Sequence, residues 1–232
     1  MLFKQLFENE SSTYTYLISC PDKKEAVLID PVIETIERDL HILKSLGLKL
    51  THAIDTHIHA DHVTSASALR EITNCKVAGP ANDNLKCRDI NFRDKDSLTL
   101  GASLEIKAFH TPGHTDTHFS YVLEHNKRKI LFSGDALLID ACGRTDFQSG
   151  SSKELFNTIK KFFYLMPDDT KVYPAHDYNN KSCSTIFHQK KDNSLIDYKI
   201  NLKNFVQKMN DLKLDKPKKI DLAVPKNNKC GS

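Results

Sequence analysis

Several features that are common in proteins are missing from this sequence of 232 residues. It contains no tryptophan, and no apolar run approaches the ~20 residues that a membrane-spanning helix needs. The N-terminus, MLFKQLFENESSTYTYLIS, has neither the apolar core of a signal peptide nor an Arg-rich amphipathic leader. We therefore expect a soluble globular protein with no membrane partner. It would belong in the cytoplasm of a bacterium, or in the mitochondrial matrix if a leader has been removed.

Strong charge of one sign and paired cysteines are also missing. The net charge is only +3, which makes nucleic acid a poor candidate for a partner. A Lys-rich stretch at residues 212–229 is predicted to be a solvated face rather than a docking site. The six cysteines are scattered without a CxxC pair, which excludes zinc-finger spacing. This pattern predicts reduced thiols rather than a disulfide framework.

Hydrophobic periodicity predicts strands and helices that follow one another without a repeat or a linker, so residues 1–232 are expected to form a single domain. Strands are predicted at 25–30 and 50–56, each followed by helical spacing, at 33–46 and 61–73. The other predicted elements are strands around a turn at 97–111, a hairpin at 118–135, a helix that begins with a capping box at Ser151, a strand at 171–178 and a helix at 202–212. Two sheets packed face to face with helices outside satisfy this order, although periodicity alone leaves other α/β arrangements open.

Four polar clusters follow or join the predicted strands. They are THIHADH at 56–62, HTPGHTDTH at 110–118, SGDALL at 133–138 and PAHDY at 174–178. Loops at strand ends let a rigid scaffold aim side chains at a shared point, which favours one site built from all four. Neutral imidazoles and carboxylates are ligands that suit zinc or iron. The sequence therefore predicts a metal centre.

The second cluster offers three histidines, and we single out His114. The sequence TPGH presents it from a tight turn, in which Pro112 fixes one backbone angle and Gly113 permits an unusual one. The flanking His110 and His118 are alternatives that could support the ligands from outside.

The combination of HxHxDH, TPGH, GD and a late histidine resembles the metallo-β-lactamase superfamily, whose fold is an αββα four-layer sandwich. Within it, GDALLIDACGRTDFQSG at 134–150, YPAHDY at 173–178 and DLAVPKNNKCG at 221–231 resemble the persulfide dioxygenases. These are also called sulfur dioxygenases, and they include the ethylmalonic encephalopathy protein. The resemblance covers nearly the whole chain. HxHxDH alone would identify only the superfamily, whereas the run around GRTDF narrows the resemblance to the persulfide dioxygenases.

This resemblance implies one Fe(II) per chain, bound by His57, His114 and Asp135. Two histidines and one carboxylate leave open positions for O2 and for sulfur, and iron can exchange electrons where zinc cannot. Four other polar residues would then orient ligands and water around the iron instead of binding it. These four are His59, Asp61, His62 and His176.

The implied substrate is glutathione persulfide, oxidised with O2 and water to sulfite with release of glutathione. Glutathione carries carboxylates, so a cationic anchor is expected, and Arg144 is the natural candidate. Tyr178 offers a hydroxyl nearby, and Cys142 is a candidate for lining the same pocket. The structural alternatives are an ion pair between Arg144 and Asp146, and a buried filler role for Cys142. Relatives of this kind also suggest a homodimer.

The main competing interpretation is a two-metal glutathione thioester hydrolase of the glyoxalase II type, in which two ions share an activated hydroxide. The sequence retains every ligand for it: His57, His59, His114 and Asp135 for one ion, and Asp61, His62, His176 and Asp135 for the other. The GRTDFQ run, the HDY loop and a short C-terminus disfavour it. A β-lactamase is disfavoured by the missing signal peptide, and a metal-free scaffold or sensor by the intact ligands.

Overall fold

The computed structural model describes all residues from 1 to 232. Its strands are β1 (Leu2–Glu8), β2 (Thr13–Cys20), β3 (Glu25–Ile29), β4 (Lys49–Ile54), β5 (Lys76–Pro80), β6 (Ile90–Phe92), β7 (Ser97–Leu100), β8 (Leu104–His110), β9 (Phe119–His125), β10 (Arg128–Gly134), β11 (Lys171–Pro174) and β12 (Ser184–Thr185). Its α-helices are α1 (Ile36–Ser45), α2 (Ala66–Thr73), α3 (Ser152–Lys161), α4 (Ile186–Asp192), α5 (Leu202–Asp211) and α6 (Ile220–Asn227).

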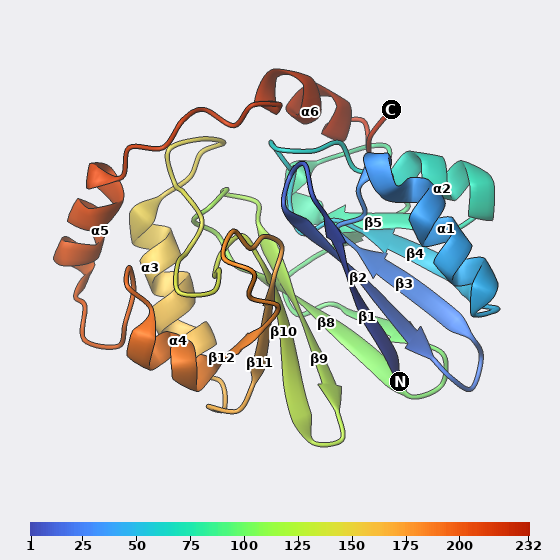
Figure 1. The fold of residues 1–232 in the computed structure, drawn as a ribbon, viewed down its shortest axis with the longest axis horizontal. Coiled ribbons are helices and arrows are strands. Elements are labelled where there is room, and N and C mark those ends of the chain that lie inside the picture. The colour runs from blue at the N-terminus through green and yellow to red at the C-terminus, as the bar shows by residue number, and fades with distance from the viewer.

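Two six-stranded sheets face each other between outer layers of helices (Figure 1). The first sheet has the order β1-β2-β3-β4-β5-β6, and the second has the order β12-β11-β10-β9-β8-β7. Helices α1 and α2 lie on the side of the first sheet, and α3, α4 and α5 lie on the side of the second. The predicted four-layer α/β sandwich is therefore confirmed.

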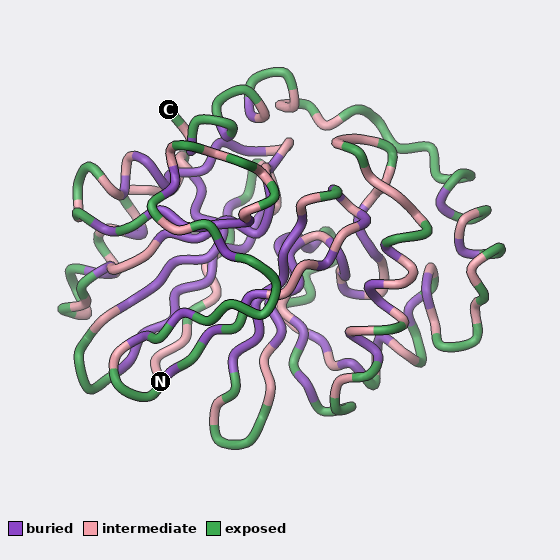
Figure 2. Tube along the Cα trace, turned by 180° about the vertical axis from the view of Figure 1, so that it is seen from behind, coloured by how far each residue is buried: buried purple, intermediate pink, exposed green.

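Alternation along the central strands explains why there are four layers. Tyr16 and Ile18 of β2 point between the sheets into one apolar cluster, whereas Leu17 points outward into the cluster under α1 and α2. In β3, Val27 likewise points between the sheets and Leu28 points outward. Side chains of a strand alternate between its two faces, so a strand that is buried on both faces requires cover on both. Figure 2 shows the sheets as largely buried and the tip of the β9–β10 hairpin as exposed.

The polar clusters meet at one rim of the two sheets. Strand β3 pairs with β4 in parallel, and β10 pairs with β11 in parallel. Because the carboxyl ends of parallel neighbours lie at the same edge, residues that follow these strands gather there. The backbone N–H of Phe119 donates to the carbonyl of Thr56 at 2.9 Å and so joins the two sheets at this rim.

Helix ends largely agree with the sequence signals. The Ser151 side chain caps α3 and accepts a hydrogen bond from the backbone N–H of Glu154. Helix α1 ends just before Gly47, which has a left-handed φ of +61°.

The helix predicted from Asp61 begins only at Ala66. The backbone N–H of Thr64 is bound by the side chain of Asn227, and its hydroxyl donates to Asp55. These tertiary contacts hold residues 61–65 in an irregular conformation that helical periodicity could not reveal.

Helix α6 was not predicted, and it lies inside the Lys-rich stretch at 212–229. The lysines of this stretch are largely exposed, as expected for a solvated face. However, the same helix buries Ala223 and Asn227. No helix of the structure combines the length and the apolar character that crossing a membrane would require.

The prediction of reduced thiols is wrong for one pair of cysteines. Cys87 and Cys230 form a disulfide, whereas the other four cysteines are free. The two bonded residues are 143 positions apart, and they meet because the C-terminal segment returns to the first sheet. No local spacing could have shown this pairing.

Candidate metal centre

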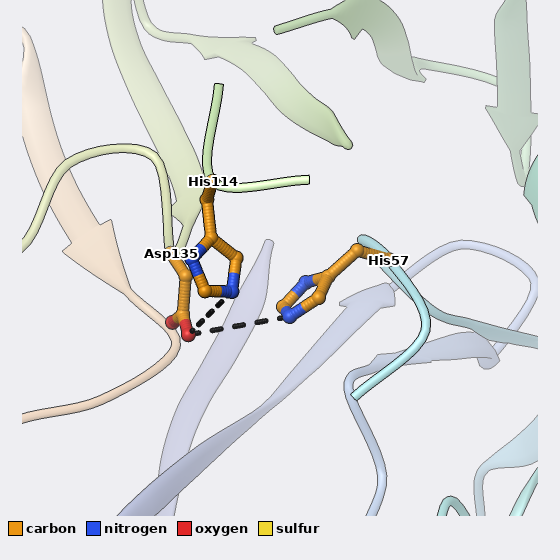
Figure 3. A group of neighbouring side chains, drawn as sticks. All are labelled: His57, His114 and Asp135. Atoms are coloured by element: carbon orange, nitrogen blue, oxygen red, sulfur yellow. Dashed lines mark ion pairs between the residues drawn. The ribbon is translucent and has the colours of Figure 1, made fainter. Parts of the chain in front are cut away.

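Three side chains from separate loops converge at the rim. His57 follows β4, His114 lies between β8 and β9, and Asp135 follows β10. Their side chains point toward one another (Figure 3). Asp135 Oδ2 lies 3.5 Å from His114 Nε2 and 4.0 Å from His57 Nε2, and one ligand atom of each residue lies within 4.8 Å of the others. The predicted ligand set is thus brought together.

The two imidazoles are fixed through their other ring nitrogens. His57 Nδ1 lies 2.9 Å from the hydroxyl of Thr56, and His114 Nδ1 lies 2.7 Å from the carbonyl of Arg144. The carbonyl can only accept, so Nδ1 of His114 carries the proton. This leaves Nε2 of His114 as a lone-pair donor that faces Asp135. Such outer hydrogen bonds are typical of metal-bound histidines.

His118, one of the two histidines that flank His114 in the second cluster, supports the backbone of Asp135. Its Nε2 accepts a hydrogen bond from the backbone N–H of Asp135 at 3.1 Å. A side chain at Gly134 would meet that ring nitrogen at 2.4 Å, and Gly134 also has a φ of +54°, so glycine is required there. His110 instead bonds the carbonyl of Asp116 at the surface.

Burial favours the neutral form of two histidines at the site, His57 and His118. Desolvation lowers the pKa of His57 well below its ordinary value, and nearby imidazoles, beginning with His59, lower it further. Desolvation and then His114 lower the pKa of His118 in the same way. A neutral imidazole is the form that binds a metal, so the electrostatics suit a cation at this position.

A second group of three lies beside the first and comes from a single loop: His59, Asp61 and His62. Asp61 Oδ2 lies 2.8 Å from His62 Nδ1 and 3.5 Å from His176 Nε2. His59 Nε2 lies 2.9 Å from Asp30 Oδ1. Burial lowers the pKa of His59, but the carboxylate of Asp30 outweighs it and raises that pKa to about 9. His176 also lies 3.6 Å from Asp135 Oδ1, so it connects the two groups.

Buried ligand atoms without partners show that the residues fit a metal ion. Asp135 Oδ1 and His62 Nε2 are buried and make no hydrogen bond. A buried polar atom without a partner is costly, and a cation is the partner that a carboxylate oxygen and an imidazole lone pair share. The donor set of nitrogen and oxygen suits zinc or iron.

A cavity of about 200 Å³ opens onto the first group. Two predicted substrate residues, Arg144 and Tyr178, line it, and the Tyr178 ring is stacked on His176. The remaining lining residues are His57, Ala60, Asp61, His114, Asp135, His176 and Pro217. A small polar chamber at the metal position can admit part of a substrate.

Arg144 is held by the protein's own groups. Its guanidinium donates to both oxygens of Asp146 at 2.7 Å, and Nη1 donates to the carbonyl of Asp215 at 2.6 Å. It also lies 4.6 Å from the centre of the Phe147 ring. The structural alternative for this residue, an ion pair with Asp146, is therefore present.

Cys142 lies outside the cavity. Its side chain is 6% exposed, belongs to the apolar cluster under the outer helices and lies 3.8 Å from the sulfur of Met209. Burial raises the pKa of its thiol to about 12. The expected pocket role of Cys142 is therefore not supported, and the buried-filler alternative describes it.

Sequence reasoning missed three residues that support the site. Asp30 receives hydrogen bonds from the backbone N–H and hydroxyl of Thr56 as well as contacting His59. It is a polar residue after a predicted strand, so the strand-end rule could have found it. Thr13 gave no comparable signal, because it reaches the site only through the fold. Asn227 lies in the run 221–231 that carries the family resemblance, but that resemblance assigned it no role.

Comparisons with known proteins agree with this geometry. The sequence profile described as the metallo-beta-lactamase superfamily matches residues 9–176. The chain belongs to this superfamily. The human protein named persulfide dioxygenase ETHE1, mitochondrial, is 41% identical across 100% of this chain and 89% of its own length. The chain therefore also belongs to the family of that relative.

Two further comparisons show which kind of relative is more similar to this chain. The crystal structure of ETHE1 from Myxococcus xanthus has a TM-score of 0.95 and 44% identity, and the match covers 100% of both chains. A hydroxyacylglutathione hydrolase from a Polaromonas species is 30% identical over 80% of this chain and 70% of its own length. The hydrolase is thus the more distant relative.

Proposed function

We propose that this protein is a persulfide dioxygenase that binds one Fe(II) and oxidises glutathione persulfide with O2 and water to sulfite and glutathione. The observation that carries this proposal is the similarity to a persulfide dioxygenase over the whole chain, at 41% identity. The convergence of His57, His114 and Asp135 at a cavity supplies the chemistry that such an enzyme needs.

His57, His114 and Asp135 are the residues that would hold the iron. Two imidazole nitrogens and one carboxylate form the ligand set of many non-haem Fe(II) oxygenases. A bound Fe(II) would supply the redox change and the open coordination positions that a reaction between O2 and sulfur requires. The hydrogen bond from His114 to the Arg144 carbonyl fixes the ring, and His118 fixes the backbone at Asp135.

Substrate contact is assigned to Arg144 and Tyr178. Arg144 is the cation among the residues that line the cavity, which suits a carboxylate of glutathione. Its contacts with Asp146 and with the carbonyls of residues 214 and 215 leave part of its donor capacity for a substrate. The Tyr178 side chain is exposed at the cavity and offers a hydroxyl.

Three expectations accompany this proposal. The chain would act as a homodimer, would form one domain and would work in the cytoplasm or in a mitochondrial matrix. The human relative is named as a mitochondrial protein, which is a statement about that relative.

The second candidate is a two-metal thioester hydrolase. It is favoured by the second group, in which His59 Nδ1 and His62 Nε2 are buried without partners. It is disfavoured because Asp61 is already bonded to His62 and Thr13. In our proposal these residues stay outside the iron and orient its surroundings.

The discriminating experiment measures metal content together with two activities on one preparation. Protein loaded with Fe(II) without oxygen should hold about one iron per chain and consume O2 when glutathione persulfide is added. The same protein loaded with zinc should stay folded and lose that activity, because zinc has no accessible redox change. Two metals per chain with cleavage of lactoylglutathione in the absence of O2 would establish the hydrolase instead.

A further inference from the structure

The C-terminal segment connects the two halves of the molecule across the rim that carries the site. After α5, on the side of the second sheet, the chain crosses the top of the view in Figure 1 and ends in α6 near α2. Along this path the carbonyl of Asp215 accepts from Arg144, and Pro217 lines the cavity. The segment is therefore in contact with the site before α6 begins.

Asn227, in the last turn of α6, bonds the backbone of the loop that carries HxHxDH. Its side-chain oxygen accepts from the backbone N–H of Thr64 at 2.9 Å. Its side-chain nitrogen donates to the carbonyls of His59 and His62, both at 2.8 Å. The side chain is buried, at 4% exposure, and bonds this loop through both ends of its amide.

The loop depends on these bonds because residues 55–65 contain no helix or strand of their own. A buried backbone group without a partner costs free energy comparable to a lost hydrogen bond. Without the Asn227 amide, the Thr64 N–H and the two carbonyls would lose their partner at once. The loop would then relax toward conformations in which water reaches these groups.

Further contacts fix the end of the chain on this loop and on the first turn of α2. The backbone N–H of Ser67 donates to the carbonyl of Cys230 at 3.0 Å. A side chain at Gly231 would lie 2.0 Å from the carbonyl oxygen of Thr64, so only glycine allows this approach. The disulfide from Cys230 to Cys87 ties the end of the chain to the segment between β5 and β6.

From these contacts we infer that Asn227 is a positioning residue of the metal centre, and that the Cys87–Cys230 disulfide holds its helix in place. Asn227 shapes the backbone from His59 to Thr64 and thereby sets where the side chains of that loop point. The inference rests on the proposed metal site, but it does not depend on which reaction the metal supports.

The test measures metal retention and ligand geometry rather than turnover. Wild type and the variants Asn227→Ala, Asn227→Asp and Asn228→Ala are loaded with Co(II), whose visible absorption reports its ligand geometry. The rate of Co(II) loss to a chelator is then recorded. Asn228 is an exposed neighbour of the same residue type and serves as the matched control.

We expect Asn227→Ala to lose Co(II) about ten-fold faster than wild type, which is the size of effect seen when residues that support metal ligands are removed. The absorption spectrum of its bound Co(II) should also change. Asn227→Asp keeps the size and the acceptor but cannot donate to the two carbonyls, so it should behave like the alanine variant. Asn228→Ala should match wild type. Unchanged cobalt loss and spectrum in Asn227→Ala, or wild-type behaviour in Asn227→Asp, would overturn the inference.

A stability control separates positioning from simple loss of the helix. Ala223→Gly destabilises α6 and leaves the Asn227 side chain in place. It should lower the melting temperature without changing the cobalt spectrum. If it changes the spectrum as much as Asn227→Ala does, the effect is one of helix stability and the inference fails.

The part of the disulfide is tested with Cys87→Ser, and Cys183→Ser is the control because Cys183 is a free, partly exposed thiol. Cys87→Ser should accelerate cobalt loss by less than Asn227→Ala, and Cys183→Ser should not change it. Combined with Asn227→Ala, Cys87→Ser should add little, because both act through one contact. Fully additive effects would contradict this link.

A wild-type protein that binds cobalt but never consumes O2 would refute the dioxygenase and leave this inference standing.

Discussion

Two neighbouring groups of potential metal ligands are built in different ways. His57, His114 and Asp135 come from three separate loops, and Asp135 keeps one oxygen without a partner. His59, Asp61 and His62 come from one loop, and Oδ2 of Asp61 already contacts His62 and Thr13. The first group is arranged around a space, whereas the second is partly bonded to itself. The comparison teaches that residue type alone does not make a ligand, since the partners of each carboxylate decide its availability.

The largest expected effect comes from removing a ligand of the first group. His57→Ala, His114→Ala or Asp135→Ala should weaken iron binding by more than about 100-fold, since even outer partners of ligands contribute 10–100-fold. Oxygen uptake with persulfide should disappear. Metal analysis after gel filtration checks this, and full iron content in any variant would remove that residue from the ligand set.

Arg144 lies on the cavity side of the first group and should have the next largest effect. Arg144→Ala should raise the apparent KM for glutathione persulfide about 10–100-fold, as expected for losing a charged hydrogen bond. Iron content should not change, because the contact to His114 uses the backbone carbonyl.

Asp146→Asn is the control for this variant, since it weakens the ion pair and keeps the arginine. It should leave KM close to that of wild type. If both variants raise KM equally, Arg144 acts by holding residues 214 and 215 in place, and the substrate assignment is wrong.

Asp61→Asn perturbs the second group and should be milder. We expect about one iron per chain, an affinity lowered roughly ten-fold, and oxygen uptake that persists. A fall from two metals to one with complete loss of activity would instead make the second group a true metal site. The comparison between the two groups would then have to be abandoned.

A change far from both groups should affect only stability. Burial raises the pKa of Asp39 to about 6, although Arg38 opposes this. The folded pKa is above the unfolded value, so the folded state loses stability as pH rises from about 4 to about 6. Asp39→Asn should therefore stabilise the protein by about 3 kcal/mol at pH 7.5 and by much less near pH 4. Urea unfolding at both pH values checks this, and an equal effect at both would contradict it. Oxygen uptake should be unchanged.

The sequence by itself determined most of the elements, although not α6, and the polar clusters that contain the proposed ligands. Period-2 and helical patterns, the cap at Ser151 and the glycine at position 47 are local signals, because they depend on neighbouring residues and backbone angles. The clustering of polar residues after strands was also readable, since parallel strands end at a common edge. The polar clusters could therefore be expected at one site, whereas the choice of His57, His114 and Asp135 within them came from the resemblance to the persulfide dioxygenases.

Only the tertiary structure decided how those residues are supported. The hydrogen bonds of Asn227 to the HxHxDH loop join residues more than 160 positions apart, and the disulfide joins residues 143 positions apart. The inward direction of Cys142 depends on Met209 of α5, a helix that packs against α3, because the two residues share one apolar cluster. Such contacts arise when distant segments are brought together by burial of apolar surface. They produce no recognisable spacing pattern in the sequence, because two residues that meet in the folded protein can be any distance apart along the chain.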